Sequence, residues 1–402
     1  MNILLLTSVY PSLDDKDENV TKVVQYFAQV WCSQGHCVKV IHNAHKYPSF
    51  VHLIPRPIKK KLATKLNFYI PDLKNVRDKV FFDGNVQVFR FPLLKLVPHG
   101  DHSKKSIEKQ AKRIQNALDE LSFVPDVIMG HWMSPQIQII SSLKNVYNCR
   151  TSLVLHGRGY IGGGNFNCKP YLPFIDKLGC RSQTESEYVQ QVLGLKEKPF
   201  VCYSGVPDSF VAQQSFNLEK FLTQPDVWKL IFVGRLVEYK QIDKILIALS
   251  KIDNKNFIFD VIGDGPEKSN LTELAYKLGL KDKVVFHGRM ERGSVLKYMN
   301  NSHIFVMISE NEVFGLVYLE AMAASCITIG SQKGGIDGVI EDGKNGILCQ
   351  QGNADSLEAV FSKVFEMDPV SLQNLSRNGF ETAKSFTDSN VAERYLKEVM
   401  DN

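Results

Sequence analysis

Short apolar strands alternate with helical stretches along most of the chain, and this alternation restricts the fold more than any other feature. Residues 3–6 form a predicted buried strand, apolar residues recur at helical spacing from Val20 to Trp31, and an apolar strand resumes at 38–41. A β-α-β unit of this kind is typical of a parallel sheet with helices on both faces. The sequence therefore predicts the α/β class.

The alternation runs through two stretches of the chain. In the first, predicted helices at 104–121 and 135–144 alternate with strands at 125–129 and 152–155. A segment rich in turn-forming residues lies near 200–210, and a new strand at 230–233 restarts the pattern. The second stretch predicts helices at 240–250, 266–278, 293–300 and 315–324 and strands at 257–262, 284–287, 304–308 and 327–329.

We therefore predict two doubly wound, Rossmann-like domains, 1–210 and 211–384. A final helix within 385–402 can pack back on the first domain. In open parallel sheets, ligands bind outside the carboxyl ends of the strands, so two such domains that face each other would enclose a cleft.

Composition excludes several other classes of protein. The 402 residues include 48 Lys and Arg against 43 Asp and Glu, and the net charge of +5 is too small to indicate a nucleic-acid binder. No apolar run approaches the ~20 residues that span a bilayer, and the run at 3–6 is too short for a signal peptide. The eight cysteines contain no C-x-x-C pair, which favours a reducing compartment. We expect a cytoplasmic protein.

The most informative segment is SENEVFGLVYLEAMAAS at 309–325, in which seven residues separate Glu312 from Glu320. Gly315 lies where a predicted strand gives way to a helix, and free N–H groups at a helix start favour a phosphate or a sugar hydroxyl. Glu312 would project from the loop, and Glu320 could bind two vicinal ribose hydroxyls. The alternative is an acidic turn that stabilises the helix dipole, with Glu320 merely solvated.

This segment resembles the retaining GT-B glycosyltransferases of family 4, which carry the same pair of glutamates around Phe-Gly. Looser likeness in the first half comes from Gly35-His36, PDVIMGHW at 125–132 and YSGVPDSF at 203–210. Four segments of the second half match the family motifs, namely FVGRLVEYKQIDKILIAL at 232–249, VIGDGPEKSNL at 261–271, VVFHGRM at 284–290 and GGIDGVIEDGKNGIL at 334–348. The resemblance implies a GT-B fold, with two Rossmann-like domains facing across a cleft.

The resemblance assigns the donor site to the second domain. Arg235 and Lys240, which follow Gly234, would contact the donor diphosphate, where cations neutralise a leaving group. Glu320 would hold the ribose, and Glu312 would hold the transferred sugar together with the backbone of Phe314, Gly315 and Leu316. Arg289 and Met290 would contact the base through backbone atoms. The alternatives are solvated surface charges for the two cations and a plain strand end for the Arg289 loop.

The resemblance also assigns roles in the first domain. His131 would approach the donor sugar and its phosphate, which makes it a catalytic candidate beside Glu312, Arg235 and Lys240. His156 and Arg158 would line the acceptor side. A structural role is the alternative for His131, and hydrogen bonding within the loop is the alternative for His156 and Arg158.

Two positions depart from the family pattern. Glu18-Asn19 stands where the family often has Gly-Gly against the diphosphate, and Gly338 stands where it usually has a glutamate. No D-x-D follows an apolar strand and no His/Cys cluster has zinc spacing, so we expect no metal and no cofactor.

The resemblance thus implies a metal-independent, retaining hexosyltransferase. It would move a sugar from a nucleoside diphosphate sugar, with UDP-sugars favoured, to a hydroxyl of a saccharide or lipid-linked acceptor in cell-surface polysaccharide assembly. Two alternatives remain open: a nucleotide-sugar 2-epimerase of the same fold, and a non-catalytic sugar-nucleotide-binding subunit.

Two basic clusters lie in the first half. Residues 56–65 hold five cations and no acid, and residues 104–113 hold five cations and one acid. Such runs are usually solvated, but basic residues interleaved with apolar ones suit an anionic membrane. We expect peripheral contact with the inner face of the cell membrane through 56–70.

Overall fold

A computed structural model describes most of the 402-residue chain. The described residues are 1–11, 21–48, 51, 54–55, 58, 76–96, 100–157, 166–253, 256–310 and 312–401. The chain divides into two compact units, the first formed by 1–181, 185–202 and 392–402 and the second by 182–184 and 203–391. The passage between units at 202–203 lies slightly before the predicted boundary at 210, and the last residues belong to the first unit.

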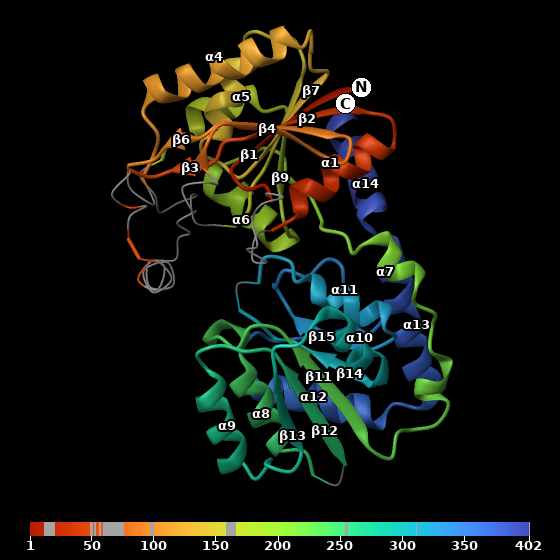
Figure 1. The fold of residues 1–402 in the computed structure, drawn as a ribbon. Helices are drawn as coiled ribbons and strands as arrows, with labels where there is room; N and C mark the ends of the chain where they lie inside the picture. Colours follow the sequence, from red (N-terminus) through yellow and green to blue (C-terminus); the bar gives the residue numbers. More distant parts are fainter. Residues whose placement is uncertain are drawn as a thin grey trace. The chain divides into compact units, whose positions relative to one another are not determined.

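An eight-stranded sheet forms the centre of the first unit (Figure 1). Its order is β10-β9-β8-β7-β1-β2-β5-β4, and every neighbouring pair is parallel except β5 and β4. The strands are β1 (Asn2–Thr7), β2 (Cys37–His42), β4 (Lys79–Asp83), β5 (Val86–Arg90), β7 (Val127–His131), β8 (Arg150–Val154), β9 (Lys177–Cys180) and β10 (Phe200–Val201). A short pair, β3 (His45–Lys46) and β6 (Leu93–Leu94), follows β2 and β5.

β1 is the switch point of this sheet, because the chain continues to β2 on one side and β7 on the other. Ile3 to Thr7 are fully buried, as expected for a central strand covered on both faces. The predicted strand at 125–129 is shifted by two residues. Asp126 instead precedes β7, where its carboxylate accepts a hydrogen bond from the Asn2 N–H at 2.7 Å.

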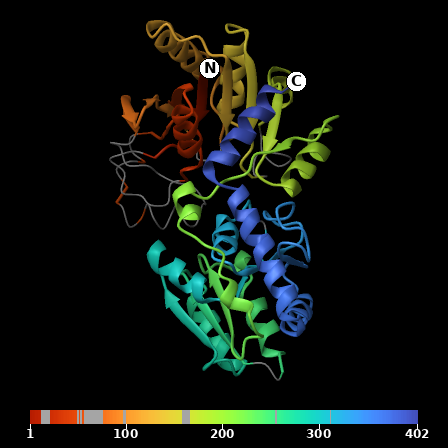
Figure 2. The same ribbon diagram turned by 90° about the vertical axis from the view of Figure 1, so that its right-hand side faces the viewer.

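Helices cover both faces of the sheet. α4 (Lys104–Glu120) and α5 (Gln136–Lys144) pack together on one face, as Figure 1 shows. α1 (Val23–Ser33, red) lies beside α14 (Asp388–Met400, blue), as Figure 1 and Figure 2 show, and the Phe27 ring packs on Tyr395 of α14. The indole of Trp31, fully buried, donates a hydrogen bond to the Ala392 carbonyl at 2.9 Å, so the C-terminal helix completes the core of the first unit.

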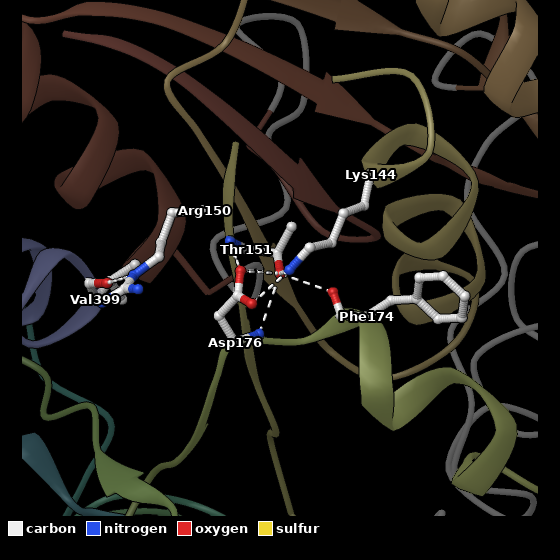
Figure 3. Close-up of polar contacts among 6 residues, drawn as sticks. All are labelled: Lys144, Arg150, Thr151, Phe174, Asp176 and Val399. Atoms are coloured by element: carbon white, nitrogen blue, oxygen red, sulfur yellow. Dashed lines mark hydrogen bonds and ion pairs between the residues drawn. The ribbon is translucent and has the colours of Figure 1, made fainter. Parts of the chain in front are cut away.

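A polar cluster fastens the start of β8 (Figure 3). The Thr151 N–H and hydroxyl donate to Asp176, and Lys144 Nζ pairs with the same carboxylate at 2.5 Å. Asp176 precedes β9 and Lys144 ends α5. Arg150 donates to the carbonyl of Val399 at 3.0 Å, which ties α14 to the same strand.

The second unit is built on a six-stranded, fully parallel sheet in the order β13-β12-β11-β14-β15-β16. This is the 3-2-1-4-5-6 order of the Rossmann fold. Its strands are β11 (Trp228–Val233), β12 (Phe257–Ile262), β13 (Val284–Gly288), β14 (Ile304–Val306), β15 (Ile327–Ser331) and β16 (Ile347–Cys349).

Helices again cover both faces (Figure 1). One face carries α8 (Ile242–Ser250), α9 (Lys268–Lys277) and α12 (Ala354–Glu366), and the other carries α10 (Arg292–Asn301), α11 (Leu316–Ala323) and α13 (Pro369–Ser385). The helix predicted from 240 begins at 242, because Gln241 adopts a left-handed conformation (φ +54°). Lys240 therefore lies in a single 3-10 turn before the helix.

Candidate functional site

Glycines bring the backbone of three strand ends together at the carboxyl edge of the second sheet. A Cβ on Gly263, after β12, would lie 1.8 Å from the Gly234 carbonyl oxygen after β11. A Cβ on Gly265 would lie 2.1 Å from the carbonyl oxygen of Leu236. The Gly263 N–H donates to the carbonyl of Gly288, the last residue of β13, at 2.9 Å. The backbones of the G-R-L, G-D-G and H-G-R motifs, at 234–236, 263–265 and 287–289, therefore pack so closely that a side chain on Gly263 or Gly265 would clash.

Lys240 and Glu312 meet beside these motifs. Lys240 Nζ pairs with Glu312 Oε2 and lies 3.5 Å from the Met307 sulfur. Their side chains are 10% and 17% exposed, so both charges are mostly withdrawn from water. Each of the two buried charges compensates the other. The pair thereby holds the Lys240 ammonium group in a fixed position at the strand ends.

The loop from β14 to α11 is fixed by close packing. Gly315 has φ +81°, and a Cβ there would lie 2.7 Å from the Tyr318 ring. The Tyr318 hydroxyl donates to the Met307 carbonyl at 2.5 Å. A Cβ on Gly335, after β15, would lie 2.5 Å from the Phe314 nitrogen. The start of α11, whose first N–H groups lack intrahelical acceptors, is thereby held in place as an anion-binding end.

Glu320 is engaged by a residue that the sequence interpretation missed. Arg292, the first residue of α10, donates from Nη2 to Glu320 Oε1 at 2.6 Å. Burial raises the pKa of Glu320, and the charge and hydrogen bond of Arg292 oppose that rise. One signal was available: a cation in the first turn of a helix opposes the helix dipole and so needs a partner elsewhere.

The remaining donor-site candidates line the same edge. Arg235 is exposed. Burial and the Glu312 charge raise the pKa of the nearby Tyr239, and the charge of Arg235 opposes this rise without cancelling it. Phe314 is buried, and Leu316 begins α11 with 36% of its surface exposed. Arg289 is exposed and Met290 half-buried after β13.

His131 is the last, fully buried residue of β7 rather than a residue after the strand. Its Nδ1 lies 2.9 Å from Nε2 of His156, whose ring stacks on Trp132 with centroids 4.1 Å apart. Burial and the charge of Arg181 hold the pKa of both histidines well below its usual value, so both are neutral near pH 7. Within the described residues, His131 Nε2 has no hydrogen-bond partner.

Three expectations fall outside the described residues: Arg158 on the acceptor side, Glu18-Asn19, and nearly all of 56–70. Gly338 has φ +93°, a conformation that disfavours the glutamate usual in the family at this position. Among the residues that the structure describes, no group of three or more His, Cys, Asp or Glu is arranged to hold a metal ion. In the same part of the chain, no helix has the length and apolar character needed to cross a membrane.

Solved structures share this fold over nearly the whole chain. A sucrose-phosphate synthase of Thermosynechococcus elongatus matches with a TM-score of 0.68 at 17% identity, over 99% of this chain and 98% of that one. The Anabaena HepE protein in complex with UDP and glucose matches with a TM-score of 0.61 at 17% identity and the same coverage. The architecture is therefore GT-B, as predicted.

Sequence comparisons support the class of glycosyltransferases. Residues 213–382 match the family model Glycosyl transferases group 1. An uncharacterized glycosyltransferase of Methanocaldococcus jannaschii is 28% identical over 269 residues, 65% of this chain and 71% of that protein. The N-acetyl-alpha-D-glucosaminyl L-malate synthase of Bacillus anthracis is 35% identical over 128 residues, only 31% of this chain and 32% of that enzyme.

Proposed function

We propose that the chain is a retaining, metal-independent hexosyltransferase that takes its sugar from a UDP-sugar. The observation that carries this proposal is the Lys240–Glu312 pair beside the start of α11. A cation and a helix N-terminus suit the diphosphate, Glu312 suits hydroxyls of the sugar, and Glu320 suits the ribose. The Anabaena HepE protein was solved with UDP-glucose, which favours the same class of donor here.

In the proposed reaction, the bond between the anomeric carbon and the diphosphate oxygen breaks, and the acceptor oxygen bonds to the same face of that carbon. The acceptor proton passes to the departing phosphate oxygen, so no protein nucleophile is needed. Lys240, Arg235 and the start of α11 stabilise the negative charge that develops on the leaving diphosphate. His131, neutral and with Nε2 unpaired among the described residues, could donate or accept one hydrogen bond.

A thermal-shift screen of UDP-, GDP- and ADP-sugars tests the donor. We expect a UDP-sugar to raise the melting temperature, because a ligand that binds only the folded state stabilises it. No shift with any nucleotide sugar would overturn the proposal. A new sugar epimer formed without acceptor would show a 2-epimerase, and binding without hydrolysis or transfer would indicate a non-catalytic subunit.

Two further assays test the mechanism. Proton NMR of the product should show the same anomeric configuration as the donor sugar, and inversion would overturn retention. Activity should persist in EDTA. A loss of activity that Mg²⁺ or Mn²⁺ restores would overturn metal independence.

We propose a lipid-linked acceptor at an anionic membrane surface. The exposed face of α4 supports this, since Lys104, Lys105, Lys109 and Lys112 all lie on it. Leu94 and Leu96, 50% and 70% exposed, lie on and next to the strand β6 that packs on α4. Cations beside exposed leucines suit peripheral membrane contact.

Sedimentation with phosphatidylglycerol vesicles at low salt tests this contact. Reversal of Lys105, Lys109 and Lys112 to Glu should release the protein from the vesicles. The matched control reverses Lys229, Lys277 and Lys281, three exposed lysines of the second unit. Equal binding by the two variants, or no binding by the wild type, would contradict the proposal.

A further inference from the structure

We propose that Arg292 is a positioning residue that holds the Glu320 carboxylate ready for the donor ribose. This inference rests on the proposed function, in which Glu320 accepts hydrogen bonds from the ribose hydroxyls. Arg292 itself lies outside the segments 232–249 and 309–325 that carry the proposed diphosphate, sugar and ribose contacts.

The contact leaves Glu320 free to bind a ligand. Arg292 Nη2 donates to Oε1 at 2.6 Å, and Oε2 accepts no hydrogen bond from the described residues. The Glu320 side chain is 19% exposed, so its carboxylate has lost most of its water but can still be reached. A guanidinium on one oxygen fixes the rotation of the carboxylate, and the other oxygen faces an incoming hydroxyl.

Arg292 also keeps this carboxylate charged. Burial raises the pKa of Glu320, and Arg292 is the charge that opposes the rise. Without Arg292 the pKa would rise further and the protonated fraction near neutral pH would grow. A protonated carboxyl group has less capacity than a carboxylate to accept hydrogen bonds from two hydroxyl groups.

Other contacts hold Arg292 in place. Its guanidinium lies over the Phe210 ring, 5.1 Å from the centroid. Asp388, at the start of α14, faces Arg292; its pKa is raised to about 6 by burial and by Asp208, and Arg292 limits the rise. Asp208 begins α7 (Asp208–Ala212) and accepts a hydrogen bond from the Ser389 N–H at 3.1 Å.

Arg292 therefore interacts with two carboxylates, Glu320 on α11 and Asp388 on α14. Both attract a cation that the dipole of α10 disfavours at that helix end. The tertiary environment, and not the helix, accounts for an arginine at this position.

The test is calorimetric titration of the full chain with UDP. Arg292→Met should weaken UDP binding roughly tenfold to hundredfold, as expected when a buried carboxylate loses a charged hydrogen bond. Arg292→Lys, which keeps the charge but loses the planar fork, should restore part of the affinity. The matched control is Arg377→Met, because Arg377 also lies over a phenylalanine, Phe216, at 4.2 Å, but on α13. The control should bind UDP like the wild type.

A double-mutant cycle separates positioning from a direct contact. If Arg292 acts through Glu320, adding Arg292→Met to the Glu320→Gln variant should weaken UDP binding by less than about twofold. Additive losses would overturn the inference, because Arg292 would then contact the nucleotide independently. Wild-type affinity in Arg292→Met, with weakened binding in Glu320→Gln, would also overturn it while leaving the proposed function intact. No UDP binding by the wild type would instead overturn the choice of donor.

The pH dependence provides a readout that a merely structural residue would not change. UDP affinity, expressed relative to wild type at each pH, should fall in Arg292→Met as the pH decreases toward 5, because Glu320 protonates at a higher pH in this variant. Asp388→Asn in both backgrounds removes the titration of Asp388, whose pKa burial and the Asp208 charge raise to about 6. A ratio that stays flat with pH would contradict the inference.

Discussion

Lys240 and Glu312, 72 residues apart in the chain, form a mostly buried ion pair at the carboxyl edge of the second sheet. Lys240 comes from the turn between β11 and α8, and Glu312 from the loop between β14 and α11. Because the two strands are neighbours in the sheet, their following loops converge at this point. The pair is thus a direct product of the Rossmann strand order.

Lys240→Met should lower kcat by about 10² to 10³, the usual effect of removing one group that stabilises transition-state charge. The variant also leaves the Glu312 carboxylate mostly buried without its cation, which would repel a diphosphate. Steady-state kinetics with the preferred donor measures the effect. Lys244→Met is the control, because Lys244 lies on α8 and pairs with its neighbour Asp243 at 3.1 Å. Turnover at the wild-type rate in Lys240→Met would refute its catalytic assignment.

Gly263→Ala should disrupt the donor site without touching a charged residue. The new Cβ would require the backbone at Gly234 to move, since it would lie 1.8 Å from that carbonyl oxygen. The φ of Gly263, +146°, is also unfavourable for alanine. We expect weaker UDP binding and a lower melting temperature. Gly293→Ala is the control, because its Cβ would meet nothing within 4 Å, and a similar loss there would contradict the explanation.

The sequence was most informative where function and local structure coincide. Strand, loop and helix follow one another around Gly234 and Gly315, so the motif itself placed Lys240 and Glu312 at one sheet edge. The role of Arg292 could not be predicted from the sequence, because its partner Glu320 is 28 residues away and no local pattern indicates a contact between two helices. Its unfavourable place at a helix start was the only local sign.

Several helices and strands were absent from the sequence prediction, for different reasons. β4 and β5 pair as an antiparallel hairpin in which Asp83 pairs with Val86 and Gly84-Asn85 form the two-residue turn, and a Gly-Asn turn is itself a hairpin signal. α13 begins after Asp368, whose carboxylate caps the helix, followed by Pro369. Here too the signal was present. The short strand β10 (Phe200–Val201), in contrast, depends on pairing with β9 and has no recognisable pattern of its own.

Lys220→Met should destabilise the second unit by about 2–3 kcal/mol, because it leaves buried carbonyls without a donor. Lys220 Nζ donates to the carbonyls of Met299 and Ser302 at the end of α10, and of Ala324 at the end of α11. Scanning calorimetry should show the loss. Lys277→Met, an exposed lysine paired with Glu273, is the control and should change stability little. A wild-type transition in Lys220→Met would contradict this role.

Asp176→Asn should lower the stability of the first unit by about 1–3 kcal/mol at pH 7. Burial alone would raise the pKa of Asp176, but hydrogen bonds from Lys144 and Thr151 outweigh it, so the pKa is lowered (Figure 3). The stabilisation is therefore complete above the unfolded pKa of ~3.9 and lost as the pH falls below it. Urea unfolding should show the gap between variant and wild type closing below about pH 4. A pH-independent gap would show that packing alone is responsible.

Three buried histidines near the ends of β2 and β5 should make the first unit sensitive to acid. Burial lowers the pKa of His42 and His45 to about 3, with Arg90 and Lys95 respectively adding to the shift. Burial lowers the pKa of His102 to about 4; its hydrogen bond to the Leu94 carbonyl opposes the shift and Lys95 adds to it. All three are thus neutral in the folded state.

Unfolded histidines titrate near pH ~6.5, so the unfolded chain binds more protons than the folded one between that pH and about 4. The free energy of unfolding should therefore decrease as the pH is lowered through this window, by about 2 kcal/mol per histidine at pH 5. Calorimetry from pH 5 to 8 should show the first unit's transition moving to lower temperature as the pH decreases. His102→Gln should flatten this dependence by roughly a fifth, because His131 and His156 of the same unit also have lowered pKa values and contribute in the same direction. An unchanged slope in His102→Gln would show that other groups dominate the acid sensitivity.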